Sequence, residues 1–572
     1  MTGAPTPVTV GLIFLYGVML ARPAEGQCDT SRASVSSGGD EAGGESVEVD
    51  VSQDGRCVTF RSFADDLVEG DDNRLSDVLL HDLKTGETTL VSVSATGEQG
   101  DGESFLSSVS RGGRFVAFES SATNLVPGLT PIARSVYVRD RLAPTTTMIS
   151  LSPAGEPAND RCFDVQISDD GRYVTFSSAA DNLVEDDENR DLDGFLVDRL
   201  TGRLERFTVS SAGAEANGGC DRPRLSRDGR FAVFYSSATN LVEGDTNGQT
   251  DVFLRDLRKG TTVRVSVRPD GVQGDGPSTD AAVADGGRFV AFTTNATNLV
   301  TADTNGTWDV VLWDGASSGL TRVSVSSEGR QANEACEGPT ISPDGSIIGF
   351  YSGATNLVED DTEGQRDVFL RDRRAHSTYR VSVNDAGEGS DGDQTQHALS
   401  SAACAVAFPS LGRNLVPDDF NEARDVFVRV CGPPAPYNYC TSEPGSAGTP
   451  ATMGWSGSTS VASDDLILEV HGAVPSQIGL FCYGPEQTLA FLGDGFLCIG
   501  AGDLGLFRLH PPQRTDESGG ALQPLRLADP PAEAGRILAG SSWNFQFWFR
   551  DPWVPARSGF NLSDGLAATF CR

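Results

Sequence analysis

The feature that most constrains this chain is a repeat of 58 residues that runs through seven copies without insertion or deletion. A phenylalanine marks the same place in each copy, at Phe60, Phe118, Phe176, Phe234, Phe292, Phe350 and Phe408. Repeats of about 20 to 50 residues or slightly more are typical of propellers, solenoids and helical arrays. The pattern inside one repeat decides among these architectures.

The fourth copy shows four short strands. An apolar strand ends at Leu225, an Asp-Gly turn follows, and a second strand covers Arg230 to Tyr235. After a long loop, Asp251 to Asp256 and Thr262 to Val267 form two more strands around a short turn. Such turns are those of antiparallel hairpins. The sequence therefore predicts an all-β fold, a seven-bladed β-propeller over residues 28–431.

The two ends of the repeat region predict a closed ring. The seventh copy supplies only three strands before the pattern stops at Cys431, and Arg32 to Ser36 aligns with the fourth strand of the other copies. We expect this N-terminal segment to complete the last blade. The alignment also places Cys28 and Cys431 on either side of one tight turn, which predicts a disulfide between them.

Composition and the N-terminus indicate where the protein works. Residues 1–26 contain a short apolar run, Val8 to Ala21, and a small-residue cleavage motif, which predicts a signal peptide. We expect a secreted or periplasmic monomer with no integral membrane segment after cleavage. The formal charge of −36 argues against nucleic acid as a partner, because such binding depends on Lys and Arg.

A second domain follows the repeats. Residues 432–437 are a Pro-rich linker, and residues 438–572 carry alternating strands that predict a small β-sandwich or jelly-roll. Its four cysteines allow three pairings. We favour Cys440–Cys571, joining the ends, and Cys482–Cys498, joining neighbouring strands.

Oxygen-rich loops between the second and third strands are candidate Ca²⁺ sites. The candidate ligands are Asp71, Asn73 and Asp77; Asp187, Asn189, Asp191 and Asp193; Asp245, Asn247 and Asp251; Asp303, Asn305 and Asp309; Asp361, Glu363 and Asp367; and Asp419, Asn421 and Asp425. Oxygen ligands at alternate positions suit Ca²⁺. The alternative is that these residues only make Asx turns and cap their own backbone. Blade two, with Leu129 and Ser135, lacks the pattern.

No catalytic motif stands out. The five histidines share no repeat position, and the Gly315 to Gly319 match to a nucleophile elbow falls in a hairpin turn rather than before a helix. A pair of carboxylates suited to glycoside cleavage remains open on the acidic face.

The motif Ser-x-Asp-Gly-Arg-x-x-x-Phe at Ser226 to Phe234, followed by Asp-Val-Phe-Leu-Arg-Asp at Asp251 to Asp256, resembles the TolB-like (WD40-like, PD40) propeller repeat of bacterial envelope proteins. The C-terminal segment around Trp543 to Phe549 looks like a domain at the ends of secreted bacterial proteins. The resemblance implies a binding or assembly module, although propellers also host hydrolases and lyases.

Two functions follow as hypotheses. The first is a binding or scaffold protein that recognises a protein or glycan through the acidic face of the propeller that carries the long loops, with Ca²⁺ as an optional cofactor. The second is an extracellular glycan-active hydrolase or lyase with carboxylates near the propeller channel. We favour a non-enzymatic role, because recognition usually uses variable loops on a rigid scaffold.

Overall fold

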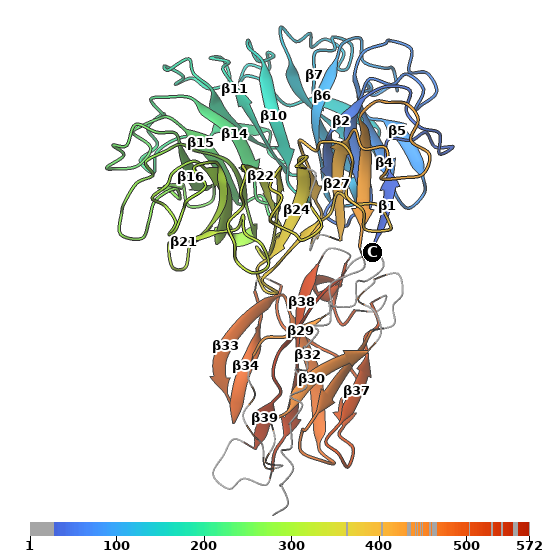
Figure 1. Ribbon diagram of the computed structural model, residues 1–572, viewed down its shortest axis with the longest axis vertical. Helices are drawn as coiled ribbons and strands as arrows, with labels where there is room; N and C mark the ends of the chain where they lie inside the picture. Colours follow the sequence, from blue (N-terminus) through green and yellow to red (C-terminus); the bar gives the residue numbers. More distant parts are fainter. Residues whose placement is uncertain are drawn as a thin grey trace, which may run out of the picture.

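Two β-structured parts make up the chain in the computed structural model, with the propeller above and the C-terminal domain below in Figure 1. The described residues are 28–570 except 362–363, 402–403, 432–435, 441, 443, 445, 447, 449, 457–458, 460, 462–465, 503, 528–529, 539–540 and 553–558. The expected signal peptide, most of the expected linker, Glu363 and Cys571 lie outside them.

The described part of the propeller contains seven four-stranded sheets. The innermost strands are β2 (Ser46–Val51), β6 (Ser104–Val109), β10 (Cys162–Ile167), β14 (Cys220–Leu225), β18 (Ser278–Val283), β22 (Cys336–Ile341) and β26 (Ala398–Leu399). The second strands are β3 (Cys57–Ser62), β7 (Phe115–Ser120), β11 (Tyr173–Ser178), β15 (Phe231–Ser236), β19 (Phe289–Thr294), β23 (Ile347–Ser352) and β27 (Ala405–Ser410). The third strands are β4 (Asp77–Asp82), β8 (Ser135–Asp140), β12 (Asp193–Asp198), β16 (Asp251–Asp256), β20 (Asp309–Asp314), β24 (Asp367–Asp372) and β28 (Asp425–Val430). The outermost strands are β5 (Glu87–Leu90), β9 (Thr145–Met148), β13 (Arg203–Arg206), β17 (Thr261–Arg264), β21 (Gly319–Arg322), β25 (Ser377–Arg380) and β1 (Asp29–Arg32).

The repeated Ser-x-Asp-Gly motif makes the tight turn between the first two strands. In blade four, Ser226 Oγ donates to Asp228 at 2.5 Å and accepts the backbone N–H of Phe231 at 2.9 Å. Gly229 has a φ of 70°, the left-handed region that glycine adopts without strain. All tight turns lie on one face of the ring, and the long loops lie on the other. We call these the tight-turn face and the long-loop face.

Neighbouring blades are wedged together by an aromatic ring. The Phe115 ring of blade two packs against Gly171 in the first turn of blade three, where a Cβ atom would overlap it. Tyr173 packs in the same way on Gly229, Phe231 on Gly287 and Phe289 on Gly345. Glycine is therefore required at this position for two reasons: it adopts the left-handed backbone conformation, and it leaves space for the ring of the preceding blade.

The predicted closure of the ring is confirmed. β1 pairs with β28, with Arg32 opposite Phe427, which is the register of Arg264 opposite Phe253 in blade four. Cys28 and Cys431 form a disulfide, with their Cα atoms 4.1 Å apart. First and last segments of the repeat region are thus joined by hydrogen bonds and by a covalent link.

In the described part of the C-terminal domain, two of the three sheets pack around one core. One contains β29 (Tyr437–Asn438), β40 (Leu566–Thr569), β38 (Ser542–Arg550), β32 (Ile478–Gly484), β35 (Phe507–Arg508), β36 (Gln513–Arg514) and β39 (Phe560–Leu562). The other contains β30 (Thr452–Ser456), β31 (Ile467–His471) and β37 (Ala521–Pro524). Leu468 and Val470 of the small sheet share a buried core with Phe545 and Phe547 of the large one, as in a sandwich.

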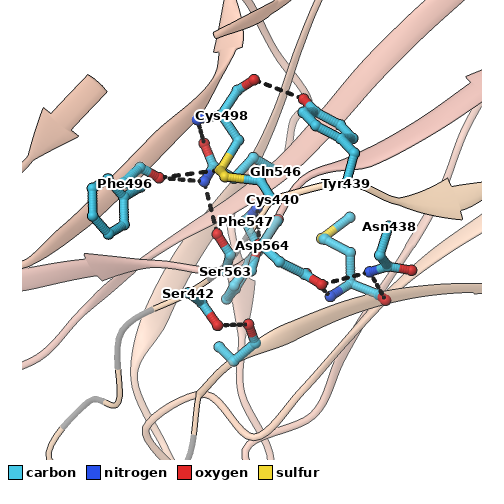
Figure 2. The surroundings of a disulfide bond; sticks show 12 residues. Asn438, Tyr439, Cys440, Ser442, Phe496, Cys498, Gln546, Phe547, Ser563 and Asp564 are labelled. Carbon is cyan, nitrogen blue, oxygen red and sulfur yellow. Dashed lines mark hydrogen bonds between the residues drawn. A yellow bond between two sulfur atoms is a disulfide. The ribbon is translucent and has the colours of Figure 1, made fainter. Parts of the chain in front are cut away.

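Both disulfides predicted within this domain, Cys440–Cys571 and Cys482–Cys498, are wrong. Cys440 bonds Cys498 with Cα atoms 6.1 Å apart, and Cys482 is a buried free thiol. The reason is that β33 (Glu486–Leu492) and β34 (Gly495–Gly500) form a separate hairpin. In Figure 2, the Tyr439 hydroxyl donates to Cys498 O and the Cys498 N–H donates to Gln546, which hold this hairpin beside the start of the domain.

The remaining cysteines divide into two kinds. Cys57, Cys162, Cys220 and Cys336 are buried free thiols in the propeller, whereas Cys404 is disulfide-bonded. In the part of the chain that the structure describes, no helix is long and apolar enough to span a bilayer.

Candidate functional site

The acidic loops fold around an arginine. In blade four, Asp251 is buried and accepts hydrogen bonds from Ser266 Oγ at 2.5 Å and from Arg264 at 3.1 Å. The same guanidinium lies 3.0 Å from Asp245. Asn247 donates its side-chain amide to Asp251 at 3.1 Å. The predicted ligands of this loop therefore do come together, and a guanidinium lies among them.

The same arrangement recurs in four other blades. The corresponding guanidinium groups are those of Arg206 in blade three, Arg322 in blade five, Arg380 in blade six and Arg32 in blade seven. Two sets of carboxylates are compact enough to hold a metal ion, with oxygens within 4.8 Å of one another: Asp187, Asp193 and Glu215, and Glu41, Asp419 and Asp425. In both, the arginine contacts all three members. Binding of Ca²⁺ here stays a prediction, and an ion would have to compete with the arginine.

The asparagines and Asp191 contribute differently. Asn189 Oδ1 accepts the backbone N–H of Asp191 at 2.6 Å, and Asp191 is exposed. Asn73 and Asn305 accept the N–H of the residue two positions on, at 2.7 and 3.2 Å. These contacts are Asx turns, the alternative weighed for the loop residues.

Blades one and five add a glutamine bridge. Gln331 donates to both Asp303 and Asp309 at 2.9 Å. In blade one, Gln99 donates to Asp71 and Asp77 at 2.7 and 2.8 Å. These four predicted carboxylates thus lie together as pairs.

Burial of the carboxylates predicts how stability depends on pH. Burial raises the pKa of Asp193, Asp367 and Asp425 to about 6. A raised pKa means that the folded state binds protons more tightly than the unfolded state does. The stabilisation of the fold by these protons is complete below about pH 4 and is lost as pH rises through 6. We expect the melting temperature at pH 5 to exceed that at pH 8 by several degrees, measured by circular dichroism at constant ionic strength. A melting temperature that is flat or rises over this range would contradict the expectation.

The inner strands surround a central channel of about 680 Å³. Each of β2, β6, β10, β14, β18 and β22 shifts register against its second strand, as between Val47 and Asp50 in blade one. Glu48, Asp164, Arg222 and Asp280 occupy these bulges with φ of 54°, 59°, 45° and 36°. All four line the channel.

These bulge residues were not identified from the sequence. Charged residues in left-handed backbone are strained, and such strain and such bulges gather at binding and catalytic sites. The signal that could have revealed them is a charged residue at a spacing of 58 in the innermost strands, at Asp164, Arg222 and Asp280.

A charged and aromatic group lies near the long-loop end of the channel. Glu119 pairs with Arg134 at 3.1 Å, and burial raises the pKa of this carboxyl to about 8. Arg134 and Arg61 lie 3.5 and 4.6 Å from the centre of the Phe105 ring. Arg61 also pairs with Glu48 at 3.5 Å. Carboxylates, guanidinium groups and a ring together can hold a polar ligand.

Large apolar side chains are exposed on the loops between the second and third strands of three adjacent blades. Phe420 and Leu411 in blade seven, Phe63 in blade one and Ile132 in blade two have exposed fractions of 75, 45, 44 and 75%. Leu411 and Phe63 occupy the same repeat position, where the other blades have Ser, Ala, Asn or Gly. We call these four residues the apolar cluster.

Exposed carboxylates lie on the same loops as the apolar cluster. The exposed acidic residues of the same loops in blades one and seven are Asp65, Asp66, Glu69, Asp72, Asp418 and Glu422. Arginines pair with the inner carboxylates of blades three to seven, whereas most of these exposed groups face solvent. Glu422 pairs with Arg413 at 3.1 Å. The long-loop face is therefore apolar at points and strongly negative around them.

The chain is similar to TolB-like and WD40-like propellers. No family model matches the chain, and no curated protein matches it. Among solved structures, it is similar to an oligogalacturonate lyase from Vibrio parahaemolyticus, with 13% identity over 72% of this chain and 92% of that one and a TM-score of 0.40. It is also similar to TolB from Acinetobacter baumannii (13%, 67% and 78%, TM-score 0.32) and to the RRP9 WD40 repeats (9%, 70% and 97%, TM-score 0.38). The blade assignment itself rests on the sheet order.

Proposed function

We propose that the protein is a secreted or periplasmic binding protein whose long-loop face docks a positively charged protein across blades seven, one and two. The observation that carries the proposal is the apolar cluster on three adjacent blades within an acidic rim. Exposed aromatic and aliphatic groups rimmed by polar residues mark interaction sites on soluble proteins.

Charge explains the choice of partner. A face rich in exposed carboxylates attracts a basic surface and repels nucleic acid and anionic membranes. The disulfides support a location outside the cytoplasm, because such bonds persist in oxidising compartments.

Substitution of the apolar cluster tests this function. We expect the double variant Phe420→Ser and Ile132→Ser to weaken partner binding at least tenfold, because central apolar contacts contribute about 2 kcal/mol each. The partner is captured on immobilised wild-type protein from the secreted proteins of the source cells, and its affinity is then measured by surface plasmon resonance. Affinity should also fall steeply between 50 and 500 mM NaCl.

The matched control lies on the tight-turn face. Leu142 and Leu200 are exposed to 76 and 77% in turns of blades two and three, and their replacement by serine should leave affinity unchanged. Equal loss in both double variants, or salt-independent binding, would refute docking on the long-loop face.

The glycan-active alternative has one observation in its favour. Glu119, with a pKa of about 8, would be protonated at neutral pH, as a general acid requires. Release of reducing ends or unsaturated products from a panel of polysaccharides, lost in Glu119→Gln, would favour this second function.

A further inference from the structure

The blades can be compared with one another at one position, where most of them hold the guanidinium group of an arginine. In blade five, Arg322 lies 3.2 Å from Asp309 and 3.6 Å from Asp303 and donates to the backbone carbonyl of Ala302 at 3.2 Å. Arg206, Arg380 and Arg32 likewise donate to the carbonyl that precedes the first aspartate of their loop. A positive charge thus sits between two aspartates and one carbonyl oxygen.

Blade one keeps the acceptors of this site and lacks the cation. Asp71, Asp77 and Gln99 correspond to Asp303, Asp309 and Gln331, but Leu90 stands where blade five has Arg322. Leu90 is partly buried and packs against the apolar core between blades seven and one. Blade two, whose Met148 also replaces the arginine, has lost the aspartates as well.

The two carboxylates of blade one are buried without a compensating charge. Asp77 is fully buried, and Asp71 is 8% exposed. Oδ1 of Asp71 accepts from Gln99, whereas its Oδ2 is inaccessible to solvent and has no hydrogen-bond partner. Burial, with a smaller contribution from the nearby Asp77, raises the pKa of Asp71 to about 6. Buried charges are normally paired or coordinate a metal.

We propose that blade one binds one Ca²⁺ ion between Asp71 and Asp77, in the position that an arginine guanidinium occupies in blades three to seven. The ligands are the two carboxylates and the backbone carbonyl of Gly70, which corresponds to Ala302. Both residues have left-handed φ, 86° and 54°, so the loop presents this carbonyl in the same way. Oxygen ligands with two negative charges suit Ca²⁺ better than transition metals.

The site does not depend on the proposed docking function. Of the six loops that the sequence predicts as Ca²⁺ sites, this proposal keeps only the loop of blade one. In the other five loops an arginine already supplies the positive charge.

Isothermal titration of full-length, chelator-treated protein with CaCl₂ in 150 mM NaCl tests the proposal. We expect one ion per chain, with a rise in melting temperature at saturating Ca²⁺. Leu90→Arg, which restores the residue of the other blades, should weaken Ca²⁺ binding at least tenfold. The matched variant Arg322→Leu should create a second site of the same kind in blade five.

Three outcomes would overturn the proposal. These are no binding up to 10 mM Ca²⁺, binding unchanged by Leu90→Arg, or tighter binding of free guanidinium than of Ca²⁺ with competition between them. If Arg322→Leu does not fold, Asp71→Asn takes its place: loss of Ca²⁺ binding with an unchanged fold supports the site, and retained binding refutes it.

Discussion

Gly171→Ala is expected to lower the free energy of unfolding of the propeller by about 3 kcal/mol or more, since it combines left-handed backbone with overpacking. The φ of Gly171 is 71°, and its Cβ would overlap the Phe115 ring of the preceding blade. That ring cannot turn aside, because Arg114 and Arg199 lie 4.5 and 4.3 Å from its centre. Urea unfolding followed by fluorescence or circular dichroism measures the change.

Gly155→Ala is the matched control for this prediction. Gly155 also has a left-handed φ, 82°, but a Cβ there would meet no atom within 4 Å. The control should cost only about 1 kcal/mol, the backbone contribution. Equal losses in the two variants would mean that the wedge between blades contributes nothing.

Replacement of Cys28 and Cys431 by serine is expected to destabilise the propeller by about 4 kcal/mol, because the bond closes a very long loop in the unfolded chain. The two cysteines are 403 residues apart in sequence. The double variant should therefore melt well below the wild-type protein under non-reducing conditions, and addition of dithiothreitol to the wild-type protein should reproduce the shift.

Cys440→Ser with Cys498→Ser serves as the comparison for the closure disulfide. This pair closes a separation of 58 residues within the other domain. It should leave the unfolding of the propeller unchanged, as followed by proteolysis of the repeat region. A propeller that is as stable without Cys28 and Cys431 as with them would show that β1 pairing alone holds the ring.

The ring and its closure were predictable because they depend on local and periodic signals. The closing Phe recurs every 58 residues, and the register of Arg32 with Arg264 needs only an alignment of the chain with itself. The arginine at that position was also visible in the alignment, but its approach to the acidic loop was not. The arginine lies at the end of the outermost strand, and it contacts the loop between the second and third strands of the same blade. Sequence order does not show this contact.

The two failures have a different origin. Cys482 and Cys498 are close in sequence, but they lie on different sheets, because β32 pairs with β38 and β34 pairs with β33. The disulfide partner of Cys498 therefore depends on where the β33–β34 hairpin packs, which the sequence does not show. The bulge residue Glu48 belongs to a type that rarely adopts left-handed backbone, so propensity gives no hint of it.

The exit point of the chain determines which side of the ring remains accessible. Cys431 leaves β28 at the tight-turn face, where its N–H donates to Cys404 O at 2.9 Å and where Cys28 is bonded to it. The segment that leads to the C-terminal domain and the first described residue therefore emerge together, opposite the apolar cluster. Immobilising the protein through its C-terminal domain would therefore display the long loops on the side away from the support.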